Sequence, residues 1–124
     1  MQDRLGLKQS CGALDFNLGC SGFVYGLSIA RGLVESGDAS CVLLITAETY
    51  SKYMHETDRS VRTIFSDGAS AAVVRAEEAT TQLLGPFLFG TDGRGGENLV
   101  VRAGGHRIPR CDDTALVKDG GDGI

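Results

Sequence analysis

The chain of 124 residues is 42% hydrophobic and 23% charged, which suits one modest domain with a core and excludes two full domains. The composition excludes disorder of the whole chain, and the net charge of −4 offers no electrostatic attraction for nucleic acid or an anionic membrane surface. No apolar run approaches the roughly 20 residues that span a bilayer, and the first residues do not resemble a secretion signal. We therefore expect a cytoplasmic protein without a nucleic-acid or membrane partner.

The first third of the sequence predicts a strand, a helix and a second strand. The short apolar run 12–18 ends at Gly19 and suits a buried strand that enters a tight turn. Residues 20–35 follow the helical period with apolar side chains around most of the circumference, which predicts a helix buried between layers. Gly37 suits the end of this helix because glycine tolerates a positive φ. The run "ASCVLLITAE", residues 39–48, predicts a strand buried on both faces, as in a parallel sheet.

The rest of the chain provides few further elements. Residues 49–60 are a polar loop, and "GASAAVVRA", residues 68–76, predicts a strand whose small side chains allow close packing. Residues 82–93 are a candidate for one more strand, whereas 106–124 are a Gly-rich loop or tail. The predicted strand, helix and strand form a βαβ unit with a right-handed crossover. Such a unit belongs to a wider sheet, so we expect a single unit that is part of an α/β domain.

The four cysteines are Cys11, Cys20, Cys41 and Cys111. None forms a C-x-x-C pair, and only two histidines accompany them, so we expect neither a metal site nor a cofactor. Cys41 lies inside an apolar run, where we expect it to pack as a small core residue.

Cys20 raises the main functional question. At the start of the predicted helix, unpaired backbone N–H groups and the helix dipole stabilise a thiolate. Gly19 and Gly22 permit close approach of a substrate, and the Cys20 amide is placed to stabilise an oxyanion. The alternative is an inert structural cysteine. These local features alone favour that alternative, because free cysteine is among the most buried residue types.

Two motifs shift the interpretation toward a nucleophile. "DFNLGCSGFVYGLSIARGLVESG", residues 15–37, resembles the active-site segment of the beta-ketoacyl-acyl carrier protein synthase III family, within the thiolase-like superfamily. "TDRSVRTIFSDGASAAVV", residues 57–74, is similar to that family's D-R-x-x-x-x-x-F-G-D-G-A-x-A-x-V segment, and its distance from Cys20 agrees with the family. Ser66 and Ser70 occupy positions at which glycine is common in that family. The resemblance covers residues 4–105, the middle of the family's chain.

The resemblance implies part of a thiolase-like layered α/β fold, with a βαβ unit, a buried central helix and a mixed sheet. It implies that Cys20 is the catalytic nucleophile and that Arg59 stacks on the adenine of coenzyme A. Tyr50 and Phe65 match positions that line the acyl pocket in relatives, and 68–75 matches a strand that pairs across a homodimer. An ordinary core aromatic is an equal alternative for Phe65, and a solvated loop arginine is the alternative for Arg59.

The implied reaction starts when acyl-coenzyme A acylates Cys20, and decarboxylative condensation with malonyl-acyl carrier protein follows, in fatty acid or related biosynthesis. The family uses a histidine and an asparagine for decarboxylation, and neither His55 nor His106 lies in a matching context. We therefore expect an incomplete N-terminal half of the fold that does not complete condensation alone. We expect a fragment of a full-length synthase, with a truncated relative as the alternative. Half of such a fold leaves apolar surface exposed on the 41–47 layer.

Two other functions remain open from the sequence. One is a thiolase-like acyltransferase that moves the acyl group to a hydroxyl or an amine without decarboxylation. The other is a non-catalytic assembly module that retains the fold.

Overall fold

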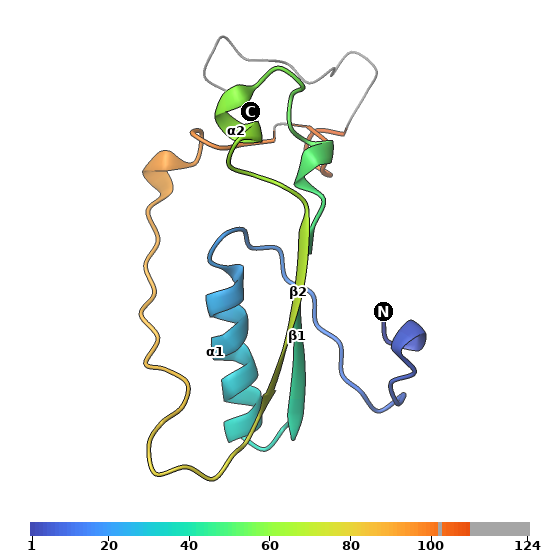
Figure 1. The fold of residues 1–124 in the computed structure, drawn as a ribbon, viewed down its shortest axis with the longest axis vertical. Helices are drawn as coiled ribbons and strands as arrows, with labels where there is room; N and C mark the ends of the chain where they lie inside the picture. The colour runs from blue at the N-terminus through green and yellow to red at the C-terminus, as the bar shows by residue number, and fades with distance from the viewer. Residues whose placement is uncertain (102, 110–124) are drawn as a thin grey trace.

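Two strands and one long helix form the body of the computed structural model, which describes residues 1–101 and 103–109 (Figure 1). Cys111 therefore lies outside the described residues. Of the tail predicted at 106–124, only residues 106–109 are described. The helices and strands are, in chain order, α1 (Gly22–Glu35), β1 (Cys41–Glu48), α2 (Arg59–Arg62) and β2 (Gly68–Arg75). Single 3-10 turns occupy Asp3–Leu5, Tyr50–Lys52 and Gly93–Gly95.

β1 and β2 form a two-stranded antiparallel sheet. The ladder runs without interruption from Cys41 opposite Arg75 to Glu48 opposite Gly68. Both strands confirm the sequence prediction, but β1 has no parallel neighbour within the described residues. The loop 49–67 joins β1 to β2. A loop of this kind reverses the direction of the chain and gives antiparallel pairing, whereas parallel pairing requires a longer crossover connection. The loop 49–67 therefore leaves and re-enters at one end of the sheet.

α1 packs against the sheet through its smallest residues. Gly22, Gly26 and Ala30 are its buried positions, and their spacing of four places them on one face of the helix. A Cβ atom at Gly26 would lie 2.6 Å from Leu44 Cδ1 and 3.3 Å from the Phe16 ring. Glycine at this position therefore allows the close approach of helix and strand.

The end of α1 agrees with the sequence. Gly37 has a φ of 82°, and its N–H donates to the Val34 carbonyl oxygen over 3.2 Å. A residue with a side chain would be strained in this left-handed conformation. The predicted helix end at Gly37 is confirmed.

An extended segment, residues 76–92, runs along α1 on the side away from the sheet (Figure 1). Arg31 donates to the Leu84 carbonyl oxygen over 3.0 Å, and its guanidinium also pairs with Glu35. The rings of Tyr25 and Phe89 lie 4.5 Å apart between centroids. The strand predicted at 82–93 is not formed, because no strand in the described part of the chain pairs with this segment.

Residues 12–18 also differ from the prediction. They approach α1 through the Phe16 ring but form no strand. A strand needs a hydrogen-bonded neighbour, and the described residues supply none to this run. The α1–β1 part of the expected βαβ unit is thus present, while its first strand is extended chain without a partner here.

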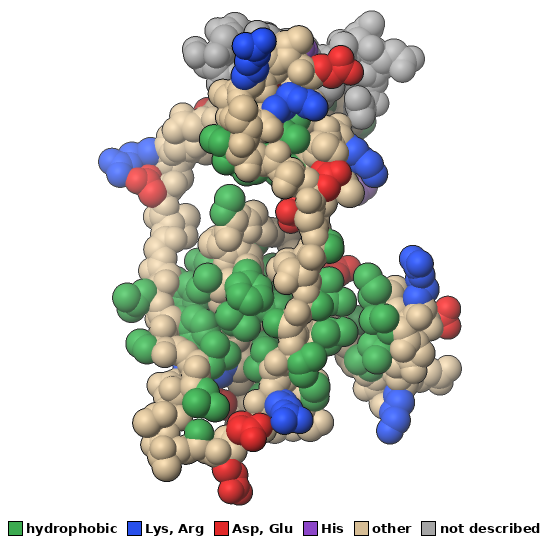
Figure 2. All heavy atoms as spheres, viewed as in Figure 1, with side chains coloured by type: hydrophobic (Ala, Val, Ile, Leu, Met, Phe, Trp, Pro, Cys, Tyr) green, Lys and Arg blue, Asp and Glu red, His purple; other side chains and the backbone are tan. Residues whose placement is uncertain are grey.

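The buried core is small, and apolar side chains remain on the surface (Figure 2). α1 has a single sheet layer beside it, so Phe23 and Ile29 are exposed instead of buried between layers. Leu43 and Ile45 are 41% and 39% exposed. Cys41 shares their face of β1 because strand side chains alternate, so it is exposed instead of packed in the core as expected. The buried hydrophobic residues are Ala30, Leu44, Met54 and Val61.

Candidate active site

Cys20 lies in a tight turn immediately before α1. The Gly22 N–H donates to the Gly19 carbonyl oxygen over 2.7 Å and closes the turn. Ser21 is the N-cap residue, so Cys20 precedes the helix by two residues instead of opening it as the sequence predicted. Its thiol is free and exposed. Nothing lies within 4 Å of the position that a Cβ atom would take on Gly19, which leaves space for a substrate beside the turn.

Backbone donors next to the thiol are available to a ligand. The Cys20 N–H donates no backbone hydrogen bond in the described part of the chain. The Ser21 side chain also makes no capping bond at the start of α1. The first N–H groups of a helix lack intrahelical partners and carry partial positive charge. This turn is therefore suited to stabilise negative charge, on a thiolate or on an oxyanion.

The structure brings Tyr50 and Phe65 together. Their rings are stacked, with centroids 4.7 Å apart and planes inclined by 15°. Tyr50 begins the 3-10 turn after β1, and the Phe65 N–H donates to the Val61 carbonyl oxygen over 2.9 Å after α2. Both side chains are half-buried. Two residues predicted separately as pocket-lining thus form one apolar surface.

A pair of hydrogen bonds closes the base of the same loop. Both the N–H and the hydroxyl of Ser51 donate to the carboxylate of Asp67, over 2.8 and 2.7 Å. We call these two residues the Ser51–Asp67 clasp. No sequence pattern predicted this clasp, although Asp67 lies within the second matched motif. Its partner Ser51 is distant in sequence and carries no pattern of its own.

Arg59 is the first residue of α2. The Asp58 side chain caps this short helix by accepting from the Ser60 N–H over 2.9 Å. Thr63 donates from its hydroxyl to the Arg59 carbonyl oxygen over 2.9 Å. The Arg59 side chain is exposed, so its guanidinium is accessible to a ligand.

Tyr50, Arg59 and Phe65 all lie in the loop 49–67, whereas Cys20 lies outside it. The start of α1 points toward the end of the sheet from which this loop emerges (Figure 1). Among the described residues, no hydrogen bond or ring contact joins Cys20 to the loop. The structure therefore assembles the predicted binding residues on one loop, with the thiol at the same end of the sheet.

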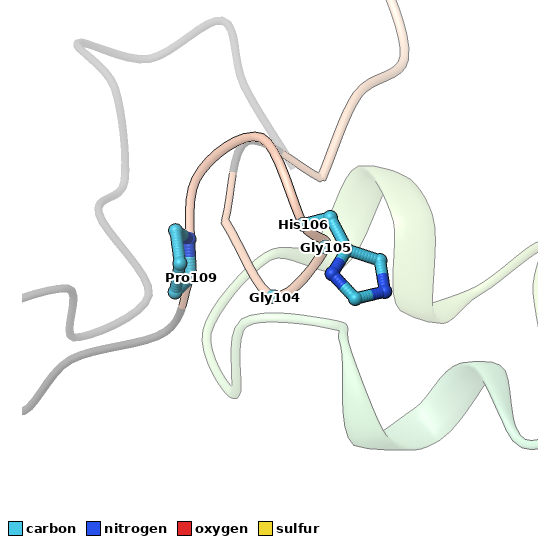
Figure 3. Close-up of a pocket in the computed structure, with 4 residues that line it drawn as sticks. All are labelled: Gly104, Gly105, His106 and Pro109. Atoms are coloured by element: carbon cyan, nitrogen blue, oxygen red, sulfur yellow. The ribbon is translucent and has the colours of Figure 1, made fainter.

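The two histidines lie in loops, as the sequence indicated. The His55 ring nitrogen Nδ1 lies 3.1 Å from the Thr57 hydroxyl. His106 lines a surface hollow of about 250 Å³ together with Gly104, Gly105 and Pro109 (Figure 3). The Gly104 N–H donates to the Ile108 carbonyl oxygen over 2.9 Å and closes this turn. Cys20 is not among the described residues that line this hollow.

The Ser51–Asp67 clasp makes the Asp67 carboxyl titrate abnormally. The hydroxyl and backbone hydrogen bonds from Ser51 hold the pKa of Asp67 below its ordinary value of 3.8. The folded state therefore binds this proton less readily than the unfolded state. The carboxylate favours folding above pH 3.8, and that contribution is lost as the pH falls through the lowered pKa.

Replacing Ser51 with Ala is expected to raise the pKa of Asp67 toward 3.8, because the hydroxyl bond is the largest cause of the shift. Carboxyl carbon shifts followed by NMR against pH measure this change. Asp92 is the internal control, because Arg94 lowers its pKa and Ser51 does not contact it. An unchanged Asp67 pKa in the variant would contradict the clasp.

Residues 1–101 and 103–109 contain no cluster of three His, Cys, Asp or Glu side chains able to hold a metal ion. Within the same residues, none of the helices combines the length and the hydropathy needed to cross a bilayer.

The sequence matches the family model described as 3-Oxoacyl-[acyl-carrier-protein (ACP)] synthase III over residues 14–93. The beta-ketoacyl-[acyl-carrier-protein] synthase III of Caldanaerobacter subterraneus subsp. tengcongensis is 48% identical over 102 residues, which are 82% of this chain and 30% of that protein. A Streptomyces coelicolor relative, beta-ketoacyl-[acyl-carrier-protein] synthase III 3, is 49% identical over 98 residues, with 78% of this chain and 29% of the relative covered.

Solved structures agree with these relatives. A crystal structure of a 3-oxoacyl-(acyl-carrier-protein) synthase III has a TM-score of 0.87 at 62% identity and covers 92% of this chain and 34% of that one. The synthase III structure from Thermus thermophilus has a TM-score of 0.73 at 37% identity, and the match covers 90% of this chain and 33% of that one. The chain thus spans about a third of these proteins, and its fold is part of a thiolase-like layered α/β fold. The chain belongs to the 3-oxoacyl-[acyl-carrier-protein] synthase III family.

Proposed function

We propose that this chain carries the nucleophile of a beta-ketoacyl-acyl carrier protein synthase III, with Cys20 accepting an acyl group from acyl-coenzyme A. The observation that carries the proposal is the exposed Cys20 thiol in a turn before α1, inside the segment that matches the family. The thiolate sulfur attacks the thioester carbonyl carbon and forms a new C–S bond. The bond to the coenzyme A sulfur then breaks, and coenzyme A leaves as a thiolate.

The oxyanion of the tetrahedral intermediate needs a donor, which the Cys20 N–H supplies in this proposal. Tyr50 and Phe65 form an apolar wall for the acyl chain, and Arg59 stacks on the adenine of coenzyme A. The second substrate is malonyl-acyl carrier protein, which condenses with the acyl group in fatty acid or related biosynthesis. We also propose that the enzyme acts in the cytoplasm.

A homodimer is part of the same proposal. The strand β2 uses one edge for β1, and its other edge has no strand beside it among the described residues. Its small side chains at Ala69, Ala71 and Ala72 suit a close strand–strand contact. A second copy paired through 68–75 would occupy that edge.

Incubation of the purified chain with acetyl-coenzyme A, followed by intact-mass measurement, tests the proposal. We expect the chain to gain one acetyl group, located on the peptide that contains Cys20. A chain that stays unmodified across a range of acyl-coenzyme A lengths would overturn it.

Replacing Arg59 with Ala is expected to raise the acyl-coenzyme A concentration for half-maximal acylation about tenfold. A cation on an aromatic ring contributes roughly 1–2 kcal/mol, and each 1.4 kcal/mol is tenfold in affinity. Arg62→Ala is the matched control, because Arg62 is the other exposed arginine of α2. Acyl-pantetheine lacks adenine and should acylate wild type and Arg59→Ala equally. A similar defect with both thioesters would contradict adenine stacking.

A further inference from the structure

The loop 49–67 is held closed at a point beyond the sheet. The last pair of the β1–β2 ladder is Glu48 with Gly68, and the Ser51–Asp67 clasp lies just past it. A carboxylate that accepts from a backbone N–H and a hydroxyl of one residue fixes both distance and direction. The clasp therefore sets how the two ends of the loop face one another.

The stacked rings are attached directly to the two sides of the clasp. Tyr50 precedes Ser51 in the same 3-10 turn, and Phe65 lies two residues before Asp67. The backbone of Phe65 is independently fixed, because its N–H donates to the Val61 carbonyl oxygen at the end of α2. Tyr50 has no comparable attachment to α2 among the hydrogen bonds of the described residues. The ladder fixes the chain as far as Glu48, and the Ser51–Asp67 clasp is the next contact that ties the Tyr50 side of the loop to the Phe65 side.

We propose that Ser51 and Asp67 are positioning residues that hold Tyr50 against Phe65 and thereby set the acyl-chain length that the site accepts. The inference rests on the proposed function, because the stacked pair is the proposed wall of the acyl pocket. Neither residue contacts the reacting atoms in this role. Loss of the clasp leaves Phe65 in place and frees Tyr50, so the wall recedes and longer chains fit.

The test compares Cys20 acylation by acetyl- and octanoyl-coenzyme A in the full chain, followed by intact mass. Ser51→Ala and Asp67→Asn are expected to raise the octanoyl-to-acetyl rate ratio about tenfold, the effect of a changed fit in an apolar pocket. Ser51→Thr keeps the hydroxyl and should restore the wild-type ratio. Ser66→Ala removes an exposed hydroxyl beside Asp67 and should leave the ratio unchanged.

A structural readout accompanies the rates. The ring-current shift of the Tyr50 ring protons should fall in Ser51→Ala, with Phe65→Leu as the reference for a lost stack. Ser51→Ala removes the hydroxyl bond and keeps the backbone N–H bond to Asp67, whereas Asp67→Asn alters both bonds. The double variant Ser51→Ala, Asp67→Asn should therefore change the ratio no more than Asp67→Asn alone.

The outcomes separate the two proposals. If wild type is acylated but the clasp variants keep its rate ratio and its Tyr50 shift, the positioning role is overturned and the proposed function stands. If wild type gains no acyl group from either thioester, the proposed function is overturned and the inference falls with it. A clasp variant that loses its dispersed NMR spectrum is replaced by Asp67→Glu, which displaces the carboxylate from Ser51. Its octanoyl-to-acetyl rate ratio must then rise as its Tyr50 ring-current shift falls, and an unchanged ratio with a reduced shift overturns the positioning role.

Discussion

Replacing Cys20 with Ala is expected to abolish the acyl adduct completely. The variant removes the only sulfur in the turn before α1, and no hydroxyl or amine can form the same thioester. Intact-mass measurement after incubation with acyl-coenzyme A provides the readout. The peptide that contains residue 20 should then carry no acyl group.

Two further cysteines provide matched controls for this variant. Cys11 and Cys41 are also free and exposed, so Cys11→Ala and Cys41→Ala test whether exposure alone permits acylation. Both variants should be acylated at the wild-type rate. An acyl adduct retained in Cys20→Ala, or lost in either control, would place the nucleophile elsewhere.

Replacing Gly26 with Ala is expected to destabilise the chain, although alanine is the better helix former. The new methyl group would lie 2.6 Å from Leu44 Cδ1, in the buried contact between α1 and β1. Overpacking of this kind costs about 1–3 kcal/mol in the free energy of unfolding. The gain in helix propensity, about 0.5–1 kcal/mol, is too small to offset that cost.

Gly32→Ala is the matched control, because it makes the same chemical change in the same helix. Nothing lies within 4 Å of a Cβ atom at Gly32, so this variant should gain about 0.5–1 kcal/mol from helix propensity. Urea unfolding followed by circular dichroism measures both. Equal stabilisation by the two variants would show that the Gly26 contact does not constrain the packing of α1.

Local patterns predicted the elements that depend on local forces. The helix at Gly22–Glu35 and the strand at Cys41–Glu48 were found because their apolar periods and the glycine at 37 are properties of short windows. Residues 12–18 have the composition of a strand but not its structure, because a strand is defined by a partner that a short window does not contain.

Burial was harder to predict for the same reason. The apolar circumference of α1 indicated two covering layers, but the described residues place one sheet and one extended segment beside it. Exposed Phe23 and Ile29 are thus apolar surface that this part of the chain does not cover. An apolar pattern indicates that a side chain suits a hydrophobic core, but it does not indicate which other segment covers that side chain.

The candidate site was predicted residue by residue but not as an arrangement. The family resemblance selected Cys20, Tyr50, Arg59 and Phe65, and the structure adds the stacking of the two aromatic rings. The clasp between Ser51 and Asp67 was not predicted, because it joins residues 16 positions apart through side-chain geometry. Interactions of this kind follow from the folded path of the loop.

The continuous β1–β2 ladder has a consequence for how this protein can change over evolutionary time. Glu48 and Gly68 are paired at the end of the ladder. The segment between them therefore connects two strands whose register is fixed by backbone hydrogen bonds. Because the ladder pairs residues outside that segment, we expect insertions, deletions or exchanges within it to preserve the strand register and the α1 contact at Leu44. The substrate contacts proposed at Tyr50, Arg59 and Phe65 all lie in this one segment, so they can diverge without a change in the strand pairing.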